Sequence, residues 1–148
     1  MLEIKLQRAT LDDVQTLLEI EKTTIGIKTY SGYFTEEEIK DYIKNTVVYL
    51  IKKGNDIAGS ISYEIKDENH ADLSGLVIKP EFQKQGLAKK ALAKLLEELN
   101  KFKLIDLVVH PDNVSALKLY ESFGFVVKCR KENFYGDGEP RLVMVLEH

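Results

Sequence analysis

The sequence predicts a mixed α/β domain: a central, mostly antiparallel twisted sheet of about seven strands, flanked by about four helices. Three observations support this fold class. Short alternating or β-branched runs have the pattern of strands, and segments with apolar residues at helical spacing have the pattern of amphipathic helices. In the middle of the chain a strand, a glycine turn, a helix and another strand follow one another, as in a βαβ unit.

The first third of the chain is predicted to contain a strand, a helix, a long loop and a second helix. Residues 4–8 alternate and form the first strand. Thr10 with Asp13, and Thr35 with Glu38, match the capping box, in which a threonine and an acidic residue satisfy backbone N–H groups at the start of a helix. Residues 23–34 have no clear period and are predicted to be a loop.

The remaining elements follow from turn signals and hydrophobic periodicity. Residues 47–52 and 57–65 are predicted to form a hairpin around Gly54-Asn55-Asp56, and residues 71–78 form the next strand. A helix is predicted over 87–99, a buried strand over 104–109, and a helix that Asn113 caps and Gly124 ends. Residues 125–129 and 142–146 are the last strands, which gives the order β-α-α-β-β-β-α-β-α-β-β.

The composition limits the classes of function. The chain has 148 residues, of which 44% are hydrophobic, and we expect one domain over 1–146 and an affinity-tag remnant at 147–148. A net charge of −3 gives no general attraction to nucleic acid or to anionic membranes. No run approaches the roughly 20 apolar residues of a membrane span. One cysteine and three scattered histidines predict neither a disulfide nor a metal site, and we expect a cytoplasmic protein.

The most informative segment is the turn Gln83-Lys84-Gln85-Gly86-Leu87-Ala88, between the strand at 71–78 and the helix at 87–99. Such a turn directs free backbone N–H groups and the positive end of a helix dipole at one point, where phosphate can bind. Gly86 lets a ligand approach the backbone without a Cβ in the way, and Lys84 can add positive charge. The segment is neither a Walker loop nor a dinucleotide fingerprint, so a purely structural turn is the alternative.

The turn resembles the signature of the GNAT superfamily of N-acetyltransferases, in which Gln/Arg-x-x-Gly-x-Gly/Ala occupies this position. Gln83, Gly86 and Ala88 match that pattern. A second block is similar to the later family motif Asn-x-x-Ala-x-x-x-Tyr-x-x-x-Gly-Phe, and its matching residues are Asn113, Ala116, Tyr120, Gly124 and Phe125. The predicted element order also resembles the family fold, so the resemblance covers nearly the whole chain and implies a GNAT-like fold.

The resemblance implies that acetyl-CoA is the donor. Its pyrophosphate would lie on the N–H groups of the glycine turn, and its pantetheine arm would lie beside the preceding strand, where the N–H of Val77 polarises the thioester carbonyl. Asn113 would face the cofactor, although it can equally be a plain N-cap. The implied acetyl-CoA-binding residues are Leu76, Val77, Ile78, Gln83, Lys84, Gln85, Gly86, Leu87, Ala88, Asn113 and Tyr120.

The resemblance also implies catalytic residues. Tyr120 would donate a proton to the departing CoA thiolate, while the alternative is an ordinary aromatic core residue at helical spacing. Asp72 and Glu64 are the candidate bases, because some relatives carry a glutamate on the strand before the turn. In the ribosomal-protein acetyltransferase branch a glutamate lies on the strand before the asparagine, and Val108 stands there instead. A lone histidine in a loop is usually exposed, so His110 is expected to be exposed.

The acceptor pocket is predicted between residues 23–34 and residues 133–141, which border the amine site in the family. Aromatic walls would come from Tyr30, Tyr33, Phe34, Phe134 and Tyr135. Carboxylates that could hold a cationic amine are Glu36, Glu37, Asp137 and Glu139. Residues 134–139 partly resemble the Tyr-Tyr-x-Asp-Gly-Glu segment of protein N-terminal acetyltransferases, from which Pro140-Arg141 departs. An ordinary hairpin loop is the alternative.

The function predicted from the sequence is therefore an acetyl-CoA-dependent N-acetyltransferase. It would transfer acetyl to a primary amine, on a small molecule or a protein N-terminus, by direct attack in a ternary complex. One alternative is a catalytically weak acyl-CoA-binding or sensing domain on the same fold, and another is an interaction domain without a cofactor. A monomer or a homodimer is expected.

Overall fold

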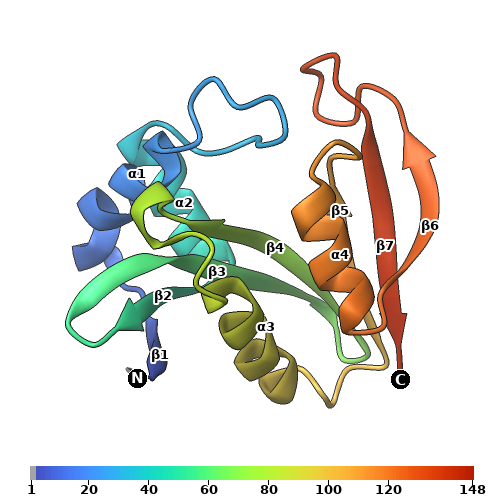
Figure 1. Cartoon of the computed structure of the whole chain (residues 1–148), viewed down its shortest axis with the longest axis horizontal. Coiled ribbons are helices and arrows are strands. Elements are labelled where there is room, and N and C mark those ends of the chain that lie inside the picture. The colour runs from blue at the N-terminus through green and yellow to red at the C-terminus, as the bar shows by residue number, and fades with distance from the viewer. Residues whose placement is uncertain (1–2) are drawn as a thin grey trace.

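One sheet of seven strands forms the centre of the molecule in the computed structural model, which describes residues 3–148. The strands are β1 (Ile4–Arg8), β2 (Val47–Lys53), β3 (Asp56–Asp67), β4 (His70–Ile78), β5 (Leu104–Val109), β6 (Val126–Lys131) and β7 (Arg141–Glu147). Their order in the sheet is β1-β2-β3-β4-β5-β7-β6. Every neighbouring pair is antiparallel except β4 and β5, which are parallel (Figure 1). The predicted fold class is confirmed.

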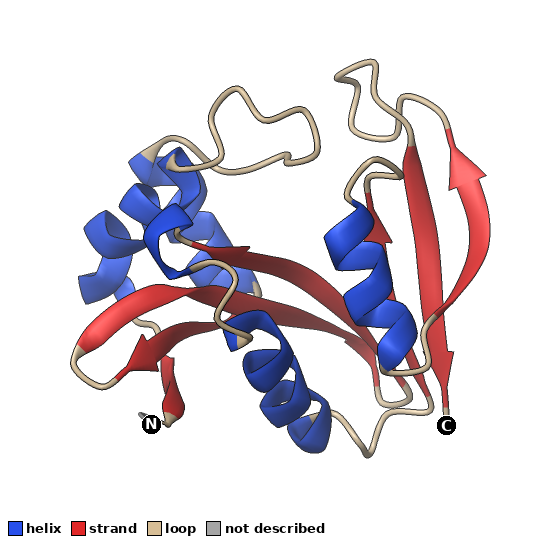
Figure 2. Cartoon of the chain, in the orientation of Figure 1, coloured by secondary structure: helices blue, strands red, loops and turns tan. Residues whose placement is uncertain are grey.

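Four helices lie on the two faces of the sheet (Figure 2). They are α1 (Val14–Lys22), α2 (Glu36–Asn45), α3 (Leu87–Glu98) and α4 (Val114–Ser122). Helices α3 and α4 contribute to the larger core cluster, in which Leu92 and Leu95 are fully buried against Ile61 and Ile105 of the sheet. Helices α1 and α2 form a second core on the other face. Apolar residues thus cover both faces of the sheet, which is the usual arrangement of an α/β domain.

The residues predicted to cap the helices do so, with one difference at Glu38. Thr10 and Asp13 form a reciprocal capping box at the start of a short 3-10 turn, Leu11–Asp13, that leads into α1. The Thr35 hydroxyl accepts the N–H of Glu38, but the Glu38 carboxylate reaches one residue further than predicted and accepts the N–H of Phe34. Asn113 caps α4, and Gly124 follows that helix at φ +96°, a left-handed conformation that glycine adopts without strain.

The feature that positions the site is the separation of β4 from β5. The two strands pair only from His70 to Leu73 on β4 and from Leu104 to Leu107 on β5. Beyond Leu73 the register between β3 and β4 shifts at Ser74, and residues 75–78 remain paired with β3 alone. The edge of β4 that faces β5 is therefore open over these residues. Figure 1 shows β4 and β5 diverging toward the end of the molecule where the α1–α2 and β6–β7 loops lie.

Close packing of β3 against β4 gives a first testable prediction. A Cβ atom added at Gly59 would overlap the carbonyl oxygen of Val77 and approach the Cα of Ile78. We expect Gly59→Ala to lower the free energy of unfolding by about 3 kcal/mol, because the backbone of a paired strand must shift to admit the methyl group. Gly26→Ala is the control: no atom lies near its added Cβ, and its φ of +81° adds only about 1 kcal/mol of strain. Equal unfolding midpoints in urea would contradict this packing argument.

The C-terminal residues are part of the fold. Glu147, predicted with His148 to be a tag remnant, is the last residue of β7 and pairs with Leu104, and the N–H of His148 donates to the Lys103 carbonyl. Within residues 3–148, no helix combines the length and the apolar character needed to cross a membrane. The same residues contain no group of histidine, cysteine or acidic side chains arranged to hold a metal ion.

Candidate active site

A cavity of about 750 Å³ lies where β4 and β5 separate. Its walls come from the end of α1, the α1–α2 loop, α2, β4, the glycine turn with the start of α3, the end of β5, α4, the β6–β7 loop and the start of β7. Thirteen of the predicted site residues line it: Tyr30, Tyr33, Leu76, Val77, Ile78, Gln83, Lys84, Gly86, Leu87, Ala88, Asn113, Tyr120 and Tyr135. The fold thus brings the two predicted halves of the site, the glycine turn and the α4 motif, to one cavity.

The glycine turn has the geometry of an anion cradle. Lys84 and Gly86 both have positive φ, at 64° and 75°, and Gly86 is the N-cap residue of α3 without a side chain to cap the helix. A Cβ added at Gly86 would meet no atom of the protein, so the space in front of the backbone is open. The first helical hydrogen bond runs from the N–H of Lys90 to the carbonyl of Gly86. The N–H groups before Lys90 therefore face outward, as a phosphate-binding turn requires.

Two glutamine side chains hold this turn in place. The Gln83 amide donates to the Ile78 carbonyl at 3.0 Å and ties the turn to the end of β4. The Gln85 amide oxygen accepts a hydrogen bond from Lys53 of β2, and the Gln85 side chain does not line the cavity. Of the predicted cofactor-binding residues, Gln83 and Gln85 thus use their side chains to position the backbone.

The open edge of β4 leads from the cavity toward the glycine turn. Leu76 and Ile78 pack toward α3 on one face, and Val77 is buried on the other face with the α1 and α2 core. Side chains therefore project above and below the strand, while its free edge presents backbone groups to the gap beside β5. An extended chain with amide groups can pair with such an edge, as a peptide does in β-strand addition.

Tyr120 lines the cavity from the last turns of α4. Its side chain is buried and packs edge-to-face against Phe125, with ring centroids 5.9 Å apart. Burial raises the pKa of Tyr120 well above its ordinary range, and the neighbouring Tyr30 raises it further. The phenol is therefore fully protonated at neutral pH. Tyr30 itself contacts Asn113, the cap of the same helix, so the α1–α2 loop reaches α4 at this point.

The two candidate bases lie side by side but in different environments. Asp72 and Glu64 are opposite each other in the β3–β4 register. Burial, together with a hydrogen bond to Asp106 of β5, raises the pKa of Asp72 to about 7. Glu64 is about 41% exposed and pairs with Lys66. Neither side chain lines the cavity, although Asp72 directly precedes Leu73, which does.

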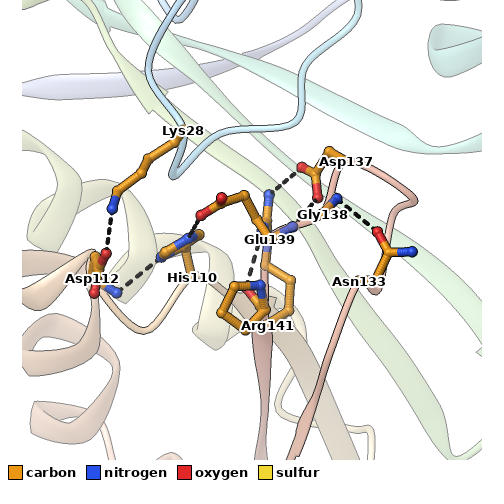
Figure 3. A network of polar contacts seen from close by, with 9 residues as sticks. Lys28, His110, Asp112, Asn133, Asp137, Gly138, Glu139 and Arg141 are labelled. Carbon is orange, nitrogen blue, oxygen red and sulfur yellow. Dashed lines mark hydrogen bonds and ion pairs between the residues drawn. The ribbon is translucent and has the colours of Figure 1, made fainter.

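The expected exposure of His110 is wrong. His110 is 2% exposed, lines the cavity at the end of β5 and contacts Glu139 through Nε2 at 2.7 Å. Its Nδ1 accepts the N–H of Asp112, whose carboxylate pairs with Lys28 of the α1–α2 loop (Figure 3). This chain of contacts joins three loops around the cavity. Sequence inspection missed it because the partners are far apart along the chain.

The remaining predicted acceptor residues divide into two groups. Glu139 contacts His110, and Asp137 accepts a hydrogen bond from the buried Arg141 (Figure 3). The Arg141 guanidinium lies over the Tyr135 ring. These two carboxylates hold the β6–β7 loop and do not line the cavity. Outside the cavity lie Phe34, Phe134, Glu36 and Glu37, and Glu36 accepts a hydrogen bond from Gln15 of α1.

Glu21, in the last turn of α1, lines the cavity and was not among the predicted site residues. It is 6% exposed, and burial raises its pKa to about 7, while the backbone N–H of Tyr33 opposes that rise. In the sequence Glu21 is one of many charged residues on an amphipathic helix. The available signal was its place on the apolar face, since it follows Leu17 and Leu18 at helical spacing.

The split sheet, the glycine turn without a side-chain cap and the tyrosine-lined cavity define an α/β protein with an open strand edge, a turn and a helix around one cavity. The model of the acetyltransferase (GNAT) family matches residues 12–125. The chain therefore belongs to this family and is an acetyltransferase, which confirms the family resemblance of its motifs.

Named relatives are similar over most or part of the chain. A ribosomal protein bS18-alanine N-acetyltransferase from Haemophilus ducreyi is 31% identical over 140 residues, which cover 90% of this chain and 93% of that protein. The catalytic subunit NAA20 of the N-terminal acetyltransferase B complex from Arabidopsis thaliana is 32% identical over 98 residues, 62% of this chain. This match spans only 56% of the NAA20 chain.

Solved structures share the fold. The ribosomal-protein-S18-alanine N-acetyltransferase of Escherichia coli superposes with a TM-score of 0.80 at 23% identity, over 98% of this chain and 94% of that chain. A GNAT family acetyltransferase from Elizabethkingia anophelis, solved with acetyl-CoA bound, gives a TM-score of 0.75 at 20% identity, over 98% of both chains.

Proposed function

We propose that this acetyltransferase moves the acetyl group of acetyl-CoA to a primary amine by direct attack in a ternary complex. The observation that carries the proposal is that the open edge of β4, the glycine turn and Tyr120 line one cavity. Acetyl-CoA would supply an activated acetyl thioester. Every other task falls to residues of the chain: binding the donor, protonating the leaving sulfur, and removing a proton from the amine.

The donor is held by backbone groups. The N–H groups from Gln85 to Ala88 suit a pyrophosphate, because the turn presents them with the positive end of the α3 dipole. The amides of the pantetheine arm suit the free edge of β4 from Leu76 to Ile78. The register with β3 corrects the predicted role of Val77: Lys79 donates to Ala58 of β3, and because N–H groups alternate along an antiparallel strand, the N–H of Val77 also points toward β3. The N–H of Leu76 points to the open edge instead and would polarise the thioester carbonyl, as preorganised donors do in acyl transfer.

Tyr120 is the proposed acid. Its phenol is protonated at neutral pH, because the ordinary tyrosine pKa of about 10 is already well above neutral and burial raises the pKa of Tyr120 further. That proton would pass to the CoA sulfur as the C–S bond breaks and the new C–N bond forms. The thiolate is a stronger acceptor in a buried site than in water, because burial penalises its charge.

Asp72 is the proposed base, acting through water because its side chain lies just outside the cavity. At pH 7 an α-amine costs only about 1 kcal/mol to deprotonate and a lysine roughly 4–5 kcal/mol, so a base with a pKa near 7 suits an α-amine. The names of two relatives, which specify N-acetylation of an alanine of ribosomal protein bS18 and N-terminal acetylation, support an N-terminal acceptor.

We predict that Asp72→Asn lowers kcat/KM for the acceptor by about 100-fold at pH 7.5, the usual effect of removing a general base. Asp72 can accept a proton only when its side chain is ionised. Therefore kcat/KM of the parent protein should rise with pH and level off above about 7. The asparagine variant should lack this inflection. Glu64→Gln tests the other candidate base. If the inflection in kcat/KM is lost in Glu64→Gln but kept in Asp72→Asn, Glu64 is the base.

The Asp72→Asn variant should remain folded at pH 8. Because the pKa of Asp72 is raised, the native protein binds this proton more tightly than the unfolded chain does between pH about 4 and about 7. Ionisation of Asp72 therefore lowers stability as the pH rises, and asparagine avoids that cost. A thermal melt at pH 8 separates lost catalysis from lost structure.

The function itself is tested by two measurements on the parent protein. Calorimetry with CoA should show binding, and mass spectrometry with acetyl-CoA and a panel of amines and N-terminal peptides should show acetyl transfer. CoA binding without transfer to any acceptor would favour an acyl-CoA-binding domain. No binding at millimolar CoA would refute both functions.

A further inference from the structure

The α1 side of the cavity contains a buried carboxylate with no cation beside it. Glu21 is 6% exposed and lines the cavity. None of the ion pairs found in residues 3–148 involves it. Its partner is the backbone N–H of Tyr33. The other carboxylate lining the cavity, Glu38, is exposed and accepts from the N–H of Phe34 and the hydroxyl of Thr35.

The α1–α2 loop is folded tightly over this carboxylate. A Cβ added at Gly32 would lie only 2.7 Å from Glu21 Oε2 and 3.2 Å from Thr24 Oγ1. Glycine is therefore the residue that lets the loop pass at this distance. The loop excludes bulk water from Glu21 on that side and leaves the cavity as its remaining neighbour.

Aromatic rings surround the carboxylate inside the cavity. Tyr30, Tyr33 and Tyr42 line the same space, and the pKa of each phenol is raised mainly by burial and in addition by the charge of Glu21. The rings of Tyr33 and Tyr42 lie with centroids 4.7 Å apart. Aromatic faces beside a carboxylate favour a cation, because ring and carboxylate both present negative potential.

The position of Tyr30 connects this group with the donor side. Tyr30 contacts Asn113 and is close enough to Tyr120 to raise its pKa. A ligand held at Glu21 would therefore lie on the acceptor side of the cavity, with Tyr30 between it and the proposed acid. A buried carboxylate without a counter-ion destabilises a protein unless a bound charge offsets it. The raised pKa of Glu21, about 7, reflects that cost.

We infer that the Glu21 carboxylate is the counter-charge for the ammonium group of the acceptor, and that Tyr30, Tyr33 and Tyr42 form the walls of this subsite. The inference rests on the proposed function for the reaction but concerns only how the acceptor is recognised. Glu21 is a specificity-determining residue: no bond is made or broken there. The acceptor class is a primary ammonium on a slender chain, and uncharged acceptors such as alcohols are rejected.

The test compares two small probes that differ only in charge and atom type at one position. L-alaninamide carries the ammonium group, and L-lactamide carries a hydroxyl in its place. Binding of each probe to the 148-residue protein is measured by NMR titration at pH 7.5, with and without CoA. We expect the parent protein to bind alaninamide at least about 10-fold more tightly than lactamide, the usual gain from a hydrogen bond to a charged group.

The variants assign that preference to Glu21. Glu21→Gln keeps an oxygen for the N–H of Tyr33 but removes the charge, so the ratio of the two affinities should fall to about one. Glu21→Asp retains a preference for alaninamide, with weaker binding of it. Glu19→Gln, an exposed site on the same helix, should leave the ratio unchanged. A purely structural role would weaken both probes equally and leave the ratio intact.

The outcomes separate this inference from the proposed function. No preference in the parent protein, or a preference that survives in Glu21→Gln, overturns the inference even if acetyl transfer is found. If the parent protein does not bind CoA but prefers alaninamide in a way that depends on Glu21, the proposed function is overturned and the inferred ammonium-binding site remains. If Glu21→Gln unfolds at a much lower temperature than the parent protein, Glu21→Asp is the deciding variant. It must bind alaninamide more weakly than the parent protein does, and lactamide with the same affinity.

Discussion

Replacing Tyr120 with phenylalanine is expected to lower kcat by about 100- to 1,000-fold, the usual contribution of a positioned acid. The substitution removes one hydroxyl from a buried ring and keeps the edge-to-face contact with Phe125, so the fold should persist. Because the phenol acts on the leaving sulfur, the affinity for acetyl-CoA should change by no more than about twofold. Steady-state kinetics and calorimetry with the same preparation check both statements.

A matched hydroxyl deletion outside the cavity serves as the control for Tyr120→Phe. Tyr49 donates to Glu98 at 2.6 Å and does not line the cavity, so Tyr49→Phe should retain kcat. If Tyr120→Phe also retained kcat within about threefold, Tyr120 would be an ordinary core residue and a different proton donor would be needed.

Replacing Gly86 with valine is expected to weaken CoA binding by at least about 100-fold. Gly86 has φ +75°, and its missing Cβ faces open space in front of the turn. A β-branched side chain would occupy the position from which a phosphate reaches the N–H groups, and it would strain a left-handed backbone. Calorimetric titration with CoA measures the effect directly.

The control for Gly86→Val is Gly26→Val. Gly26 has a similar φ of +81° and equally open space around its missing Cβ, but it does not line the cavity. Both variants should lose a similar amount of stability, about 1–2 kcal/mol. Unchanged CoA affinity in Gly86→Val would refute the phosphate cradle, whereas equal losses in both variants would indicate a general effect of destabilisation.

Much of the fold could be predicted because its signals are local. Thr10, Thr35 and Asn113 cap their helices through hydrogen bonds to residues two or three positions away, so the pattern of side chains is sufficient. Gly86 and Gly124 have the positive φ that a glycine between periodic segments indicates. The glycine turn and the α4 motif, which line the cavity, could be predicted in the same way, because each is one continuous segment.

The acceptor side could not be predicted to the same depth, because it is assembled from separate loops. His110 is buried only because Glu139, 29 residues later, is brought within hydrogen-bonding distance. Glu36 and Glu37 follow the predicted loop but lie outside the cavity, since α2 directs them away from it. Glu21 lies at helical spacing from Leu17 and Leu18 on the apolar face of α1, but its contact with the loop at Gly32 depends on the tertiary structure.

The sequence by itself thus determined the order of the elements, their caps and the glycine turn, which depend on hydrogen bonds and periodicity within a few residues. Only the tertiary structure decided that β4 and β5 pair for four residues each and then separate. The same is true of the carboxylates: burial and neighbours set the raised pKa values of Glu21 and Asp72. Strand separation and desolvation depend on contacts between distant segments, and no local pattern encodes them.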